Sequence, residues 1–117
     1  MSDCIFCKIV RHEIPAKLVY EDDKVICFHD ISPAAPVHVL IVPKVHYKDI
    51  LALNEDKDMG RDLMAAVLNA VDRVAKDQNV DEAGFRLINN CGEDGGQSID
   101  HVHFHLIGGI KLEEKLI

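Results

Sequence analysis

Three histidines near the C-terminal end of the chain carry the most distinctive chemistry of the sequence. His101, His103 and His105 are separated by single apolar residues. In a β-strand alternate side chains share one face, so we expect the three rings to line up with about 6.5 to 7 Å between successive Cα atoms. An imidazole near neutral pH is a nucleophile, a proton carrier or a metal ligand. The pattern therefore predicts a reaction centre on a strand, and the alternative interpretation is a polar stripe that faces solvent.

A glycine-rich segment comes directly before this strand. Gly95 and Gly96 are followed by Gln97 and Ser98. Two consecutive glycines allow the backbone to approach a ligand closely and to turn its N–H groups toward an anion, and the two polar side chains add donors. We expect a phosphate cradle beside the histidines, with a simple tight turn as the alternative.

A second motif places two thiols at the N-terminal end of the chain. Cys4 and Cys7 are three positions apart and would lie on one face of a helical turn. A CxxC motif alone is compatible with zinc, with redox chemistry or with chance. The strand-to-helix context of a thioredoxin-like redox motif is absent here.

Composition limits the classes of partner. The chain has 117 residues, 48% of them hydrophobic, which suits one domain with its own core. A net charge of −7, from 13 basic and 20 acidic residues, argues against binding to a nucleic-acid backbone. No apolar run approaches the roughly 20 residues that span a bilayer, so we expect no membrane partner. No signal-peptide pattern opens the sequence, so we expect a cytoplasmic location with reduced cysteines, or a nuclear one.

Hydrophobic periodicity predicts the elements that position these motifs. We expect an α+β fold in a single domain over residues 1–117, with one long helix, one short helix and about five antiparallel strands. The short N-terminal helix (3–12) would be capped by Asp3, and the long helix (about 57–78) would end at a left-handed Asn79. The expected strands are 18–20, 25–30, 37–42, 85–90 and 99–107, and a tail follows over 110–117.

Four segments together resemble one known family. Residues 101–107 match the pattern His-φ-His-φ-His-φ-φ, in which φ is apolar, and this pattern is typical of the histidine triad (HIT) family. Residues 28–33, 35–38 and 95–98 are similar to the Hint branch, which comprises purine nucleoside phosphoramidases. The resemblance runs from about Ile5 to Gly109. It implies an antiparallel meander sheet and a homodimer, with sheets made continuous and helices packed together.

The same resemblance implies a role for each site residue. His103 would attack the α-phosphorus and form a covalent nucleotidyl-histidine, which water then hydrolyses. His38 would orient and polarise this nucleophile, and His105 would bind an α-phosphate oxygen. The implied catalytic set is His103, His38, His105, Ser98 and His101. The implied contacts to the purine nucleotide are Phe6, Ile9, Phe28, His29, Asp30, Ile31, Asn90, Gly96, Gln97, Ser98, His103 and His105.

The zinc-bearing members of this family combine a CxxC motif with two histidines. The resemblance therefore implies that Cys4, Cys7, His46 and His101 hold Zn²⁺ in a closed, structural Cys₂His₂ site. Zinc would attach the N-terminal helix to the histidine strand and would not be required for the chemistry. Thiols without a metal are the alternative.

Two other functions remain open at the level of the sequence. The protein could bind nucleotides without turnover, as a scaffold, because a fold alone does not prove catalysis. It could instead be a zinc-dependent hydrolase with a His-x-His metal site. The large enzymes of that type need a barrel of about 250 residues, which this chain is too short to form.

Overall fold

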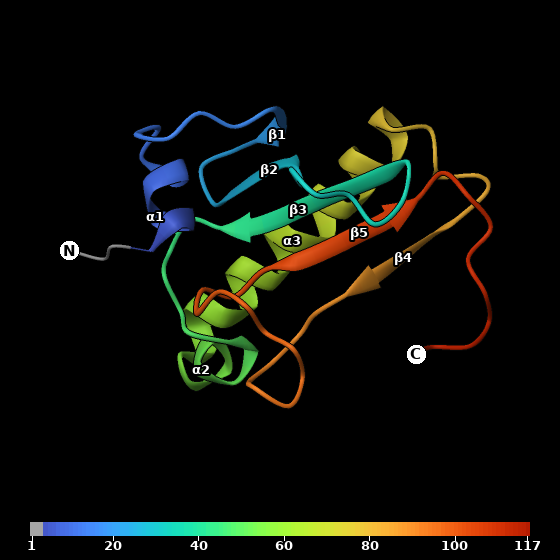
Figure 1. Ribbon diagram of the computed structural model, residues 1–117. Coiled ribbons are helices and arrows are strands. Elements are labelled where there is room, and N and C mark those ends of the chain that lie inside the picture. The colour runs from blue at the N-terminus through green and yellow to red at the C-terminus, as the bar shows by residue number, and fades with distance from the viewer. Residues whose placement is uncertain (1–3) are drawn as a thin grey trace.

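Five antiparallel strands form one sheet in the order β1-β2-β3-β5-β4, with helices on both of its faces (Figure 1). The computed structural model describes residues 4–117. Its elements are α1 (Ile5–Val10), β1 (Leu18–Glu21), β2 (Val25–His29), β3 (Val37–Pro43), α2 (Ile50–Glu55), α3 (Lys57–Asp77), β4 (Phe85–Ile88) and β5 (Phe104–Gly108). The predicted α+β class and the five antiparallel strands are confirmed.

The strand order corrects the simple meander in one respect. Strands β1, β2 and β3 are consecutive neighbours, but β5 pairs with β3, and β4 takes the outer position. The segment that carries α2 and α3 connects β3 to the outer strand β4, and the chain then returns so that β5 pairs between β3 and β4. The strand β5, which carries His105, consequently lies inside the sheet with a partner on each side.

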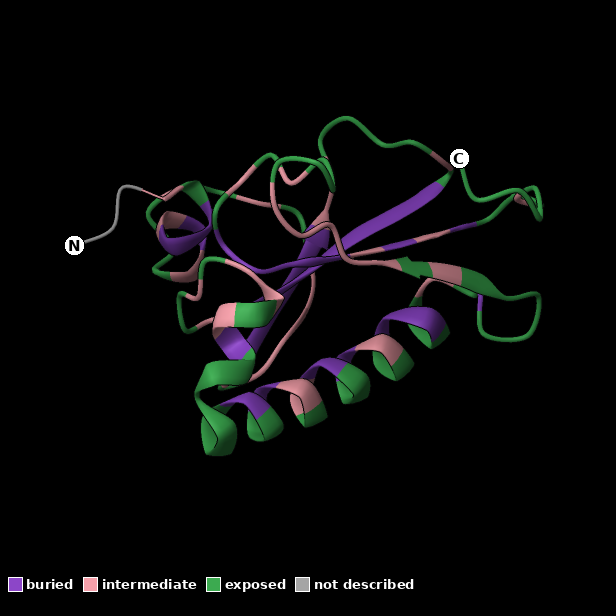
Figure 2. Cartoon of the chain, turned by 90° about the horizontal axis from the view of Figure 1, so that it is seen from below, coloured by how far each residue is buried: buried purple, intermediate pink, exposed green. Residues whose placement is uncertain are grey.

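The long helix α3 covers one face of the sheet. Its N-terminus is capped by the Asp56 side chain, which accepts from the Met59 N–H at 3.3 Å. At its C-terminus Asn79 adopts the predicted left-handed conformation, and the Val80 N–H donates to the Ala75 carbonyl, which satisfies the last turn. Figure 2 shows the buried stripe of α3 facing the sheet and its exposed residues facing away. The buried residues of α3 are Gly60, Leu63, Val67, Ala70, Val74 and Ala75.

The short helix α1 packs on the opposite face. Alternation along the strands separates two cores, because Val25 and Cys27 of β2 pack in the cluster that contains α3, whereas Ile26 and Phe28 pack with α1. Phe6 supplies the central aromatic side chain of the α1 cluster. All three layers therefore depend on the strict two-residue period of β2 and β3.

Element boundaries differ from the sequence predictions, most of all for the last strand and the N-terminal helix. The last strand begins at Phe104 rather than at residue 99, because the Val102 N–H donates to the Tyr47 carbonyl instead of joining the ladder. The helix α2 was missed, and Asp49 caps it by accepting from the Ala52 N–H at 2.8 Å. Asp3 lies outside the described residues, and Cys4 occupies the N-cap position of α1. Strand β4 ends at residue 88 rather than 90, and α1 spans 5–10 rather than 3–12.

Among the residues described, 4–117, none of the helices combines the length and apolarity that a membrane span needs.

The burial of α3 against the sheet generates a stability prediction. Leu63→Ala removes a side chain that is 1% exposed, so we expect the free energy of unfolding to fall by about 2–5 kcal/mol in urea titrations. Leu51→Ala on α2 is the matched control, because Leu51 is 66% exposed and should cost less than about 1 kcal/mol. Equal losses in the two variants would contradict the assignment of Leu63 to the core.

Candidate functional site

Three imidazoles lie buried on the side of the sheet that α1 covers. His38 on β3 is 7% exposed, His103 is 4% exposed and His101 is fully buried. The edge of the Phe6 ring contacts two of them, with centroid distances of 5.8 Å to His101 and 4.9 Å to His103. The ring of His105 follows at 5.1 Å from that of His103. The three histidines of the predicted row are neighbours, but only His105 lies within β5, and it is half-buried, whereas His101 and His103 are buried against Phe6 of α1.

The protonation of His103 is determined by a backbone carbonyl. Its Nδ1 lies 2.7 Å from the carbonyl oxygen of His101, and because a carbonyl only accepts, Nδ1 must carry the proton. The lone pair is therefore on Nε2. Burial lowers the pKa of His103, which keeps the ring neutral near pH 7. The side-chain amide of Asn89 donates to the His103 carbonyl at 2.9 Å and holds the backbone in place. His103 thus presents a neutral, oriented nucleophile.

The tautomers of His38 and His105 follow from a similar argument. The Ala34 N–H donates to His38 Nδ1 at 3.0 Å, so the proton of a neutral His38 is on Nε2. That Nε2–H donates to His105 Nδ1 at 2.9 Å, and Asp30 Oδ2 lies 3.5 Å away. His105 therefore carries its own proton on Nε2, next to His103. Burial lowers the pKa of His105, so the ring is a neutral donor.

These hydrogen bonds also decide whether Asp30, His38 and His105 could bind a metal ion. Donor atoms of Asp30, His38 and His105 lie within 4.8 Å of one another, which is close enough for a metal ion. His38 has no lone pair left for a metal, because Nδ1 accepts from Ala34 and Nε2 carries the proton. The cluster is therefore a hydrogen-bond relay. The structure places His38 against His105 rather than directly against His103.

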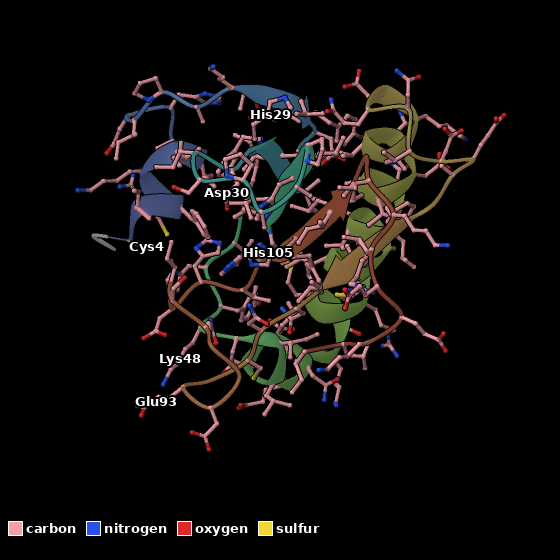
Figure 3. All side chains as sticks on the ribbon, turned by 45° about the vertical axis from the view of Figure 1, so that its right-hand side comes forward. Cys4, His29, Asp30, Lys48, Glu93 and His105 are labelled. Carbon is pink, nitrogen blue, oxygen red and sulfur yellow. The ribbon has the colours of Figure 1, made fainter. Side chains whose placement is uncertain are left out.

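The predicted nucleoside residues line one large cavity between α1 and the loop after β2. Its volume is about 1080 Å³, and most of its lining is apolar. Asp30 lies at its mouth with Oδ1 accepting from the Ser32 N–H at 2.7 Å, so this carboxylate also caps a turn. Figure 3 shows Asp30 and His105 projecting toward the same part of the molecule. Ile31 is 99% exposed at the rim, whereas Phe6 forms a buried wall. The predicted residues that line the cavity are Phe6, Ile9, Phe28, His29, Asp30 and Ile31.

The glycine-rich loop closes on itself through hydrogen bonds between residues 92 and 97. Gly96 has a φ of +77°, and a Cβ at Gly95 would come within 2.4 Å of the Cys91 carbonyl oxygen, so both positions need glycine. The Gln97 side chain is hydrogen-bonded into the loop at 2.7–2.9 Å rather than pointing outward. Ser98 is exposed and Asn90 is half-buried.

The cysteine and histidine motifs converge on one cluster at the end of α1. Distances from His101 Nδ1 are 3.5 Å to Cys4 Sγ, 3.6 Å to Cys7 Sγ and 3.1 Å to His46 Nδ1. The separation of Cys7 Sγ from His46 Nδ1 is 3.2 Å. A tetrahedral zinc with Zn–N of about 2.05 Å and Zn–S of about 2.3 Å places its ligands about 3.3 Å (N···N) and about 3.6 Å (S···N) apart. The four donors therefore fit a zinc ion.

A backbone carbonyl fixes the tautomer of His101, as another carbonyl fixes that of His103. Its Nε2 donates to the Pro43 carbonyl at 2.8 Å, which leaves the lone pair on Nδ1, toward the thiols. Burial lowers the pKa of His101 to about 4, so the ring stays neutral. A carbonyl that orients a ligating histidine is a common partner of metal sites.

Sequence reasoning missed the groups that orient these rings. The carbonyls of Pro43 and His101 and the N–H of Ala34 are main-chain groups, which leave no signal in residue type. The side chain of Asn89 was overlooked in favour of its neighbour Asn90. The register of β4 with β5, extended beyond Ile88, brings Asn90 opposite His103, so strand pairing gave no signal for Asn89.

Comparisons with known proteins agree with this architecture. The HIT domain family matches residues 11–112. A 14 kDa zinc-binding protein of Brassica juncea is 46% identical, over 94% of this chain and 96% of its own length.

Solved structures give the same result. A HIT family hydrolase from Clostridium thermocellum is 41% identical with a TM-score of 0.92, over 100% of this chain and 99% of that chain. A histidine triad nucleotide-binding protein from Candida albicans is 34% identical with a TM-score of 0.80, over 98% and 86%. The match of sequence, fold and histidine pattern over nearly the whole length means that this chain belongs to the HIT domain family.

Proposed function

We propose that this protein hydrolyses purine nucleoside 5′-phosphoramidates through a covalent nucleotidyl-histidine on His103. The observation that carries the proposal is the 2.7 Å hydrogen bond from His103 Nδ1 to the His101 carbonyl, which leaves Nε2 as the nucleophile. The lowered pKa of His103 keeps this nitrogen unprotonated at neutral pH. The names of two matched structures, a HIT family hydrolase and a nucleotide-binding protein, support the class of substrate.

The first chemical step forms the bond between His103 Nε2 and the α-phosphorus. The P–N bond to the leaving amine breaks, and the amine takes up a proton from solvent as it departs, steered by the Ser98 hydroxyl on the leaving-group side. His105 Nε2–H donates to a non-bridging oxygen, where negative charge accumulates. His38 would act through His105, because the His38 Nε2–H donates to His105 Nδ1 and so keeps the His105 proton on Nε2.

The second step reverses the covalent bond. Water attacks the phosphorus and releases one proton to solvent, the P–Nε2 bond breaks, and the nucleoside monophosphate leaves with His103 neutral again. Imidazole suits both steps because it is a nucleophile when neutral and a good leaving group from phosphorus. In the bound state Asp30 would accept hydrogen bonds from the ribose hydroxyls, and Phe6 and Ile9 would pack against the purine in the cavity.

Zinc at Cys4, Cys7, His46 and His101 would have a structural role in this scheme. Four protein ligands complete a tetrahedron, and this leaves no open position for water or substrate. The ion would connect α1, which forms a wall of the nucleoside cavity, to the backbone that orients His103.

A homodimer is the proposed assembly. Strand β4 is an edge with exposed Phe85 (38%) and Leu87 (40%), and α3 exposes Leu68 (65%) and Met59 (37%). An unpaired apolar edge next to a helix with apolar residues beyond its buried stripe favours a second copy, with the tail after residue 109 extending toward the partner.

Replacement of the nucleophile tests the proposed chemistry. His103→Ala should lower kcat for an adenosine phosphoramidate by about 10⁴-fold or more, because the covalent route is lost. Binding of adenosine monophosphate, measured by calorimetry, should remain. His12→Ala is the matched control, since His12 is exposed and lies outside the cavity. Turnover by His103→Ala at the native rate would remove His103 from this role, and no turnover by the native protein would leave a binding protein.

Metal analysis tests the proposed zinc site. The purified protein should contain about one zinc per chain, and Cys4→Ser combined with Cys7→Ser should contain none. The double variant should melt at a lower temperature, whereas its activity per folded molecule should stay within about tenfold of the native value. Cys91→Ser should retain zinc, because Cys91 is outside the cluster. A native protein free of zinc after expression with ample metal would refute the site.

Sedimentation at micromolar concentration tests the dimer. The native chain should sediment at about twice 13.1 kDa. Leu68→Glu should give a folded monomer because Leu68 is exposed, while Val67→Glu should unfold the chain because Val67 is 1% exposed. Leu51→Glu, at an exposed position on α2, should remain dimeric. A native monomer would rule out the assembly.

A further inference from the structure

The carboxamide of Gln97 makes three hydrogen bonds at the base of the glycine-rich loop. Its Oε1 accepts from the Gly92 N–H at 2.8 Å, and its Nε2 donates to the carbonyls of Lys48 at 2.7 Å and Ile99 at 2.9 Å. Both N–H groups of the amide are thereby used. This side chain is occupied inside the protein and has no donor left for a ligand.

Gln97 also closes the loop through its own backbone. The Gln97 N–H donates to the Gly92 carbonyl at 3.0 Å, so residues 92 and 97 exchange two hydrogen bonds. Between them the Gly96 N–H donates to the Glu93 carbonyl at 3.0 Å. A six-residue turn (92–97) with two adjacent glycines has high conformational entropy when unconstrained, and this pairing is what restricts it.

The same side chain connects this loop to a second segment of the chain. Residues 43–48 run beside residues 97–102 and are joined to them by three hydrogen bonds. His101 Nε2 donates to Pro43 O, Val102 N donates to Tyr47 O, and Gln97 Nε2 donates to Lys48 O. Figure 3 shows Lys48 and Glu93 on the two neighbouring loops that Gln97 joins. Because residues 99–103 lie outside the β ladder, these bonds determine where the first histidines are placed.

We propose that Gln97 is a positioning residue, whose carboxamide locks the glycine-rich loop to the segment 43–48 and so fixes Ser98 relative to His103. This rests on the proposed function, in which the loop faces the substrate phosphate. Gln97 acts through the loop and does not itself touch the substrate. Its loss should lower kcat more than it raises KM, because a misplacement of about 1 Å harms the transition state most.

Two substitutions separate the donors of the carboxamide from its acceptor. Gln97→Glu keeps an oxygen for the Gly92 N–H but directs a carboxylate at two carbonyl oxygens. Gln97→Met keeps the length and loses all three bonds. We expect kcat to fall roughly 10- to 100-fold in both at pH 8, with KM changed less than about threefold.

The pH dependence of kcat in Gln97→Glu distinguishes a positioning role from a general loss of structure. Two carbonyl oxygens facing the carboxylate raise its pKa, and once protonated it donates an O–H to one of them. The ratio of kcat for Gln97→Glu to that of the native protein should therefore rise as pH falls from 8 to 5. The same ratio for Gln97→Met should stay flat. Lys48, Glu93 and Asp94 are present in all three proteins, so their titration cancels in each ratio.

Hydrogen exchange of the loop amides tests the lock independently of turnover. Exchange of the Gly92 amide should accelerate about tenfold or more in Gln97→Met, while amides of α3 stay protected. Glu93→Gln, on the exposed side of the same loop, should change neither exchange nor kcat. Native exchange and native kcat in Gln97→Met would overturn the inference. If the native protein does not hydrolyse the phosphoramidate, the proposed function fails. Hydrogen exchange of the Gly92 amide would still test whether Gln97 holds the loop to the segment 43–48.

Discussion

The site depends on hydrogen bonds between its buried imidazoles and the main chain. In His38, His101 and His103, one ring nitrogen is bound to a main-chain group that can only donate or only accept. Carbonyls accept from His101 Nε2 and His103 Nδ1, and an N–H donates to His38 Nδ1. The free nitrogen of each ring is then determined, and burial keeps the rings of His101 and His103 neutral. Three chemically identical side chains thereby differ in which nitrogen is free, and this difference is what the proposed roles of metal ligand, nucleophile and relay require.

The metal cluster and the candidate nucleophile share one stretch of backbone. His101 offers its side chain to the cysteines and its carbonyl to His103, so a displacement of this residue affects both. The segment 43–48 supports the arrangement from the other side, because it carries His46 and accepts hydrogen bonds from His101 and Gln97. The closed Cys₂His₂ geometry and the lack of a free lone pair on His38 both argue against a metal-activated water. They favour nucleophilic catalysis by imidazole as the explanation of the triad.

Local sequence patterns were sufficient for most of the fold. The nearly all-apolar runs of β2 and β3, the apolar stripe of α3 and the asparagine at its end are determined by residue type and spacing. The short helix α2 was not predicted, because six residues after one capping aspartate are too few to show a helical period. The start of β5 was wrong because alternation continues through residues 101–103, while their hydrogen bonds go to the loop after β3.

The sequence by itself determined which residue types were available for the chemistry, since the triad, the glycine pair and the CxxC motif are local patterns. The grouping of Cys4 and Cys7 with His46 and His101 was expected only from the family resemblance. The sequence did not determine the state of any ring, nor that Gln97 would be bound inside the protein. Those properties arise from main-chain groups of Ala34, Pro43 and Lys48, which are brought into contact across 4 to 58 positions of the chain. Every residue but proline has the same main-chain donor and acceptor, so only the tertiary structure could decide which of them each side chain would meet.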